Sequence, residues 1–132
     1  MTGLPTELLL LGWSVPMLLV HLFVQGWTMI RDRGSAWGAG PRDGDAAPLG
    51  TLAGRAARAA GNYRESYPAF VALALALVVA GRDGGVGALG ATLWFAARVA
   101  YLPLYLAGVP WLRSIVWLVS LVGLVLMLAR LL

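Results

Sequence analysis

The sequence predicts an all-α integral membrane protein, a bundle of four transmembrane helices, and three observations support this fold class. Of its 132 residues 60% are hydrophobic and only 12% are charged, and the mean hydropathy of +0.79 is too high for an ordinary soluble domain. The apolar residues gather in runs long enough to cross a bilayer. Because lipid offers no hydrogen-bonding partners to the backbone, such runs must be helical.

Four apolar runs are expected to span the membrane within a single domain over residues 1–132. A span needs about 20 residues at a rise of about 1.5 Å each to cross a hydrocarbon core of about 30 Å. The expected spans are residues 4–30, 51–80, 86–106 and 112–132. The first is expected to be a permanent span and not a signal peptide, because no basic segment precedes it and it is too long.

Glycine, proline and aspartate mark the connections between these runs. Residues 34–50 are rich in all three, which disfavour helix and strand and predict an exposed connection. Residues 81–85 predict a tight turn between the second and third spans. An even number of spans places both termini on one side of the membrane.

The arginines, which supply all ten positive charges, predict the orientation. The side of the membrane away from the termini has three arginines near its connection, Arg31, Arg33 and Arg42. The side with the termini has two, Arg82 and Arg130. The positive-inside rule then predicts a multi-pass protein of the cell inner membrane with both termini outside the cytoplasm.

Two stripes of polar residues are expected on helix faces near the cytoplasmic side. On the second span the stripe lies within about 80° of arc and consists of Arg55, Arg58, Asn62 and Glu65. On the third span, with spacings of four, three and four, it consists of Trp94, Arg98, Tyr101 and Tyr105. Arg113 opens the fourth span, and Arg31 closes the first.

These helix ends are expected to bring Arg31, Arg113 and the two stripes, without Trp94, to one depth of the bilayer. Five arginines then face one carboxylate, Glu65, so the cluster lacks acidic partners and favours an anionic ligand. Guanidinium groups match carboxylates, which predicts a small molecule with more than one carboxylate, while Glu65 is free to bind an ammonium group. The alternative is that these arginines reach lipid phosphates and bind no ligand.

The residues that form the stripes resemble a known family. Residues 55–68, RAARAAGNYRESYP, are similar to the R-x-x-R-A-x-x-N-x-x-E-x-x-P signature of the MAPEG family, membrane-associated proteins in eicosanoid and glutathione metabolism. Residues 98–105, RVAYLPLY, followed by Arg113, are similar to that family's R-x-x-Y-x-x-x-Y pattern and downstream arginine. The resemblance covers about residues 51–132.

The resemblance implies a homotrimer that binds glutathione between subunits near the cytoplasmic face. It implies that Arg58 and Asn62 hold the peptide and that Glu65 binds its amino group. Tyr101 and Tyr105 would lie beside it, and Arg31, Arg55 and Arg98 would complete the binding set. Arg113 matches the arginine that stabilises the thiolate and is the candidate catalytic residue, although the interval from Tyr105 is one residue longer and contains Pro110.

The function expected from this resemblance is that of a glutathione transferase-like or peroxidase-like protein. Glutathione, or another low-molecular-weight thiol, would attack a lipophilic electrophile or hydroperoxide that enters from the bilayer. Membrane lipids are further expected partners, and no binding of nucleic acid is expected. A non-catalytic protein of the same fold that binds an anionic lipid or metabolite is the main alternative. A small four-helix transporter is a weaker one, because Glu65, its candidate proton-coupling carboxylate, lies among arginines.

Two further features of the chain bear on chemistry. His21, Gln25 and Thr28 share a face of the first span, where they either contribute to function or form hydrogen bonds between packed helices. The single His and the absence of Cys predict no metal site and no disulfide.

Overall fold

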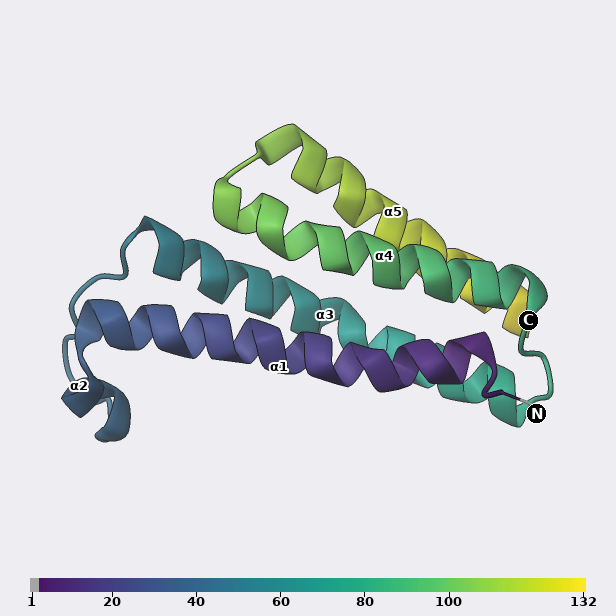
Figure 1. Cartoon of the computed structure of the whole chain (residues 1–132), viewed down its shortest axis with the longest axis horizontal. Helices are drawn as coiled ribbons and strands as arrows, with labels where there is room; N and C mark the ends of the chain where they lie inside the picture. The colour runs from purple at the N-terminus through teal and green to yellow at the C-terminus, as the bar shows by residue number, and fades with distance from the viewer. Residues whose placement is uncertain (1–2) are drawn as a thin grey trace.

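The computed structural model of the chain describes residues 3–132, and every regular element in this range is an α-helix, which confirms the all-α class. Residues 1–2 of the predicted domain lie outside the described range. The helices are α1 (Thr6–Arg33), α2 (Ser35–Ala39), α3 (Thr51–Val79), α4 (Gly85–Ala107) and α5 (Pro110–Leu131). In Figure 1, α1 packs along α3 and α4 along α5, and both termini lie at the end of the bundle opposite α2.

Three of the described helices, α1, α4 and α5, are long and apolar enough to cross a membrane. The predicted span over residues 51–80 is not among them, although α3 has 29 residues. Arg55, Arg58 and Arg64 lie in its first half, which lowers its hydropathy, while its second half is apolar. The polar half of α3 therefore needs partners other than lipid tails.

The prediction that residues 34–50 contain no helix was wrong, because α2 forms within them and raises the number of helices to five. Gly34 ends α1 with a φ of +86°, a conformation that glycine adopts without strain, and lets the chain reverse. Trp37 of α2 then packs against two guanidinium groups, 4.6 Å from that of Arg33 and 5.6 Å from that of Arg42. These contacts offset the poor helix propensity of the segment.

Close backbone contact and aromatic stacking hold α4 against its neighbours. A Cβ atom added at Gly90 would collide with the backbone carbonyl of Gly123, so the two glycines allow α4 and α5 to approach closely. Trp94 is fully buried and stacks on Phe70 of α3 with ring centroids 3.9 Å apart. These contacts fix the face that α4 presents to α3.

Polar side chains tie α1 to the rest of the bundle. The Tyr63 hydroxyl donates to the Ser14 carbonyl at 2.7 Å, and the Tyr67 hydroxyl lies 2.9 Å from the Ser14 hydroxyl. At the end where the termini lie, the fully buried Glu7 accepts a hydrogen bond of 2.8 Å from the backbone N–H of Gly84 in the α3–α4 turn. These contacts join α1 to the middle of α3 and to the α3–α4 turn.

Candidate functional site

The candidate site lies where the first half of α3 meets the C-terminal end of α4 and the start of α5. Two cavities open there. The first, the Glu65 cavity, has a volume of about 340 Å³ and is lined by Arg58, Gly61, Asn62, Glu65, Tyr101, Tyr105 and Arg113. The second, the Arg55 cavity, has a volume of about 270 Å³ and is lined by Arg55, Arg58, Tyr105, Gly108, Pro110 and Arg113. Because they share Arg58, Tyr105 and Arg113, they form one continuous polar region.

Tyr105 is the centre of this shared wall. Its hydroxyl accepts a hydrogen bond from Nε of Arg58 at 3.2 Å, and the Arg113 guanidinium carbon lies 4.7 Å from its ring centroid. Tyr101, one helical turn earlier, meets Tyr105 edge to face with centroids 5.5 Å apart. The two tyrosines thus place one arginine from α3 and one from α5 beside the same cavity.

Arg98 supports the Glu65 cavity through Asn62 and does not line that cavity itself. Its side chain is only 1% exposed, and its two terminal nitrogens donate to Asn62 Oδ1 and the Ser66 hydroxyl, both at 2.7 Å. Its guanidinium also lies over Tyr101, with the ring centroid 5.0 Å away. Arg98 therefore orients Asn62 toward the cavity instead of facing it directly.

The region carries positive charge without acidic partners. Within residues 3–132 the one ion pair is between Arg31 and Asp32, at 3.7 Å. In this part of the chain no carboxylate lies within 4.0 Å of Arg55, Arg58 or Arg113, and Glu65 stays exposed at the edge of its cavity. An anion with two acidic groups and one cationic group complements this distribution.

The structure brings together eight of the nine predicted site residues. Arg55 belongs to the cluster through the Arg55 cavity and a hydrogen bond of 3.2 Å to the Leu106 carbonyl. Arg31 lies apart from the other eight in this chain, on α1, with its guanidinium 5.6 Å from the Trp27 ring. Its expected role at the site stays a prediction.

Sequence reasoning missed two residues that shape the site. Ser66 accepts from Arg98, and its spacing of four from Asn62 on α3 was a signal that could have identified it. Gly108 ends α4 with a φ of +75°, and a Cβ atom there would lie 2.6 Å from the Arg55 guanidinium carbon. This second feature depends on tertiary contact and leaves no spacing pattern in the sequence.

The polar face of α1 is divided between local and interhelical contacts. His21 is 1% exposed, donates from Nδ1 to the Met17 carbonyl at 2.9 Å and stacks on Tyr63 with centroids 4.6 Å apart. Thr28 donates to the Val24 carbonyl of its own helix at 2.7 Å. Among the described residues no group of His, Asp and Glu side chains has the geometry of a metal site.

Comparison with known proteins gives one match. The sequence model of the MAPEG family matches residues 10–132, nearly the whole chain, including both polar stripes, most of α1 and all of α3, α4 and α5. No curated protein and no solved structure matches the chain significantly. The chain therefore belongs to the MAPEG family and is a membrane protein.

Proposed function

We propose that the protein binds glutathione, or a similar low-molecular-weight thiol, and activates it for attack on a lipophilic electrophile or hydroperoxide. The observation that carries this proposal is the group of arginines around the Glu65 and Arg55 cavities, which have no carboxylate within 4.0 Å among the described residues. Glutathione has two carboxylates, one ammonium group and one thiol. Its charges complement those of the cavity lining, and its size suits their combined volume.

Each residue of the site has a role that follows from its chemistry. Arg58 and Arg55 would hold carboxylates through charge-assisted hydrogen bonds. Asn62, oriented by Arg98, would bond to the peptide, and the exposed Glu65 would take the ammonium group. Tyr101 would pack beside the ligand, and Arg31 would join from a neighbouring subunit if the protein is the homotrimer that the family suggests.

Arg113 is the proposed catalytic residue. A guanidinium beside the sulfur favours the thiolate over the thiol, which lowers the thiol pKa and supplies the nucleophile. The sulfur then forms a bond to the electrophilic carbon while the leaving group departs with its electron pair. With a hydroperoxide, the thiolate sulfur attacks the terminal oxygen and the O–O bond breaks, which leaves a sulfenic acid and an alkoxide that takes a proton from water to become the alcohol. The sulfur of a second thiol then attacks the sulfenic acid, which gives a disulfide and water.

The surroundings of the site suit a lipophilic substrate. Trp111 and Leu112, just before Arg113 on α5, are exposed, at 82% and 49%. Apolar side chains with such exposure in a membrane protein face lipid or another subunit. We infer that the substrate enters laterally and that the site lies near the cytoplasmic side of the inner membrane, with both termini on the other side.

The test is to compare the ultraviolet thiolate absorbance and the turnover of a lipophilic aryl halide in the wild type, Arg113→Ala and Arg113→Lys. We expect Arg113→Ala to lose the thiolate signal at neutral pH and about a hundredfold in turnover, as when one electrostatic stabiliser is removed. Arg113→Lys should retain part of both. Arg64→Ala is the matched control, because Arg64 is exposed and lines neither cavity.

Other outcomes point to different functions. A thiolate signal and turnover that are unchanged in Arg113→Ala would exclude the proposed role of this arginine. Tight glutathione binding without turnover of any electrophile or hydroperoxide would favour the non-catalytic alternative, a binding protein for an anionic metabolite or lipid.

A further inference from the structure

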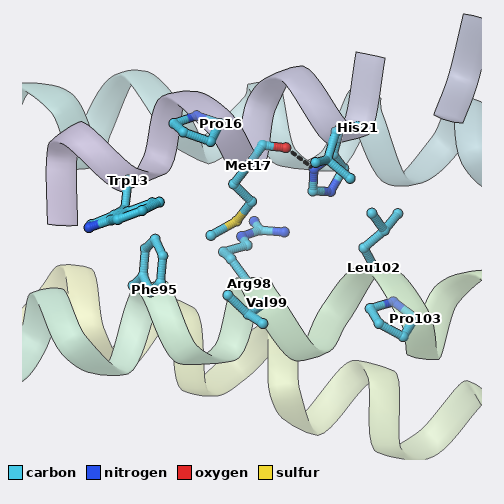
Figure 2. A pocket seen from close by; sticks show the side chains of 10 residues that line it. Trp13, Pro16, Met17, His21, Phe95, Arg98, Val99, Leu102 and Pro103 are labelled. Atoms are coloured by element: carbon cyan, nitrogen blue, oxygen red, sulfur yellow. Dashed lines mark hydrogen bonds between the residues drawn. The ribbon is translucent and has the colours of Figure 1, made fainter. Parts of the chain in front are cut away.

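A third cavity lies between α1 and α4, apart from the two polar cavities (Figure 2). Its volume is about 360 Å³, within the range of about 300–1,000 Å³ in which small-molecule sites fall. Apolar side chains from both helices form most of its wall, among them Trp13, Met17, Phe95 and Val99. Two polar residues, His21 and Arg98, complete the lining.

The cavity opens on the outer surface of the bundle. Trp13, Val20 and Val99 at its edge are 59%, 50% and 53% exposed, and they lie on two helices able to cross the membrane. A ligand would therefore enter from the bilayer and would itself be largely apolar.

His21 contributes an unused hydrogen-bond acceptor. Its Nδ1 lies 2.9 Å from the Met17 carbonyl, and because a carbonyl only accepts, Nδ1 carries the proton. In the neutral ring Nε2 is then an acceptor, and it is buried without a partner among the described residues. The ring is only 1% exposed, so water at the surface does not serve it.

Arg98 contributes an unused donor. Its terminal nitrogens are occupied by Asn62 and Ser66, while its Nε–H is buried with no partner in the part of the chain that the structure describes. Figure 2 shows the His21 ring and the Arg98 side chain extending from α1 and α4 toward each other's helix, with the Met17 side chain beside them. Buried polar groups without partners are rare and destabilising, so this donor and acceptor point to a ligand.

We propose that this cavity binds a single-chain lipid whose head is a neutral hydroxyl group. The hydroxyl donates its proton to His21 Nε2 and its oxygen accepts from the Arg98 Nε–H, while the chain packs on Trp13, Phe95 and Val99. A single water molecule would satisfy the same two polar groups, but it would leave the apolar wall of the cavity uncovered. Met17, which is unbranched and flexible, rotates to admit the head group. This binding is independent of the thiol chemistry proposed above.

The test uses the full-length protein in lipid nanodiscs and three photoreactive probes that share one long diazirine-bearing chain. The first ends in a hydroxyl, the second in a methyl ether, which accepts but does not donate, and the third in a methyl group. We expect the alcohol to label α1 and α4 peptides at the cavity several-fold to about tenfold more than the other two probes, as one hydrogen bond allows. Equal labelling by the three probes overturns the proposal.

Matched variants locate the interaction. His21→Phe keeps a ring to stack on Tyr63 but removes the acceptor, so labelling by the alcohol should fall to that of the ether. Leu22→Phe, at a neighbouring exposed position outside the cavity, should change nothing. An excess for the alcohol that persists in His21→Phe contradicts the assignment.

A second variant covers the case in which His21→Phe does not fold. Val99→Trp fills the mouth of the cavity without changing the polar pair, and it should abolish the labelling of α1 and α4 by the alcohol. Labelling of the same peptides in Val99→Trp would place the probe elsewhere and overturn the proposal. Bifunctional crosslinks from these positions to a second copy, with no probe labelling, would show that another subunit fills the cavity, which also overturns it.

Discussion

Arg98 is the residue on which the most interactions of the site depend. Its side chain is nearly inaccessible, yet it is charged, and it meets α3 through Asn62 and Ser66 and two aromatic rings through its planar face. A buried guanidinium without a carboxylate is stable only when neutral acceptors and rings surround it. Arg98 is therefore both a structural tie between α3 and α4 and the residue that positions Asn62.

Replacing Arg98 by Met should destabilise the bundle by about 1–2 kcal/mol, because Asn62 and Ser66 then lose their donor within a membrane protein. The midpoint of unfolding in a sodium dodecyl sulfate titration measures this loss. Arg64→Met, at an exposed position on α3, should leave the midpoint unchanged. An Arg98→Met protein as stable as the wild type would show that these hydrogen bonds contribute nothing.

At the scale of the helices, the close approach of α4 and α5 depends on Gly90 and Gly123. A Cβ atom added at Gly123 would lie 2.8 Å from the backbone nitrogen of Trp94, with no flexible side chain to move aside. The start of α5, with Arg113, is positioned relative to Tyr105 on α4 by this packing.

Gly123→Ala should destabilise the protein by about 1–3 kcal/mol, the usual cost of forcing extra volume into a packed interface. Gly12→Ala is the control, because Gly12 lies within α1 with nothing within 4 Å of its added Cβ atom. That change should be neutral or stabilising, since alanine favours helix. Thermal unfolding in detergent gives both values, and equal effects at the two positions would argue against close α4–α5 packing.

The sequence allowed prediction of the four long helices and of the stripes on α3 and α4, because helical spacing alone places Arg58, Asn62 and Glu65 on one face. The burial of Arg98 could not be predicted, since it depends on which face of α4 packs against α3. Helix α2 could not be predicted either, because the cation–π contacts of its Trp37 form only in the folded chain. Arg31 was grouped with the site because its helix end is expected at the same depth of the bilayer. Depth alone does not specify the side of α1 on which the Arg31 side chain lies.

For the whole molecule, both termini and the α3–α4 turn lie at one end of the bundle, and the polar site lies toward the other (Figure 1). The charge distribution predicts that the end with α2 faces the cytoplasm. Because the chain contains no cysteine, single introduced cysteines can report the orientation directly.

Asp45→Cys, in the connection after α2, should be protected from a membrane-impermeant maleimide in intact cells and react after lysis. Asp83→Cys, in the α3–α4 turn, should react in intact cells. Both positions are exposed and not part of the core, so the matched pair differs mainly in location. The reverse labelling pattern would place the site on the opposite side of the membrane.

The measurement that tests the central claim most directly is equilibrium binding of glutathione to the detergent-purified protein, with Arg58→Ala and Arg64→Ala in parallel. We predict saturable binding that weakens about 10- to 100-fold in Arg58→Ala, as expected when hydrogen bonds to a charged group are lost, and is unchanged in Arg64→Ala. Absence of binding to the purified protein, or equal affinity in the wild type and Arg58→Ala, would contradict the claim that this arginine cluster is a glutathione site.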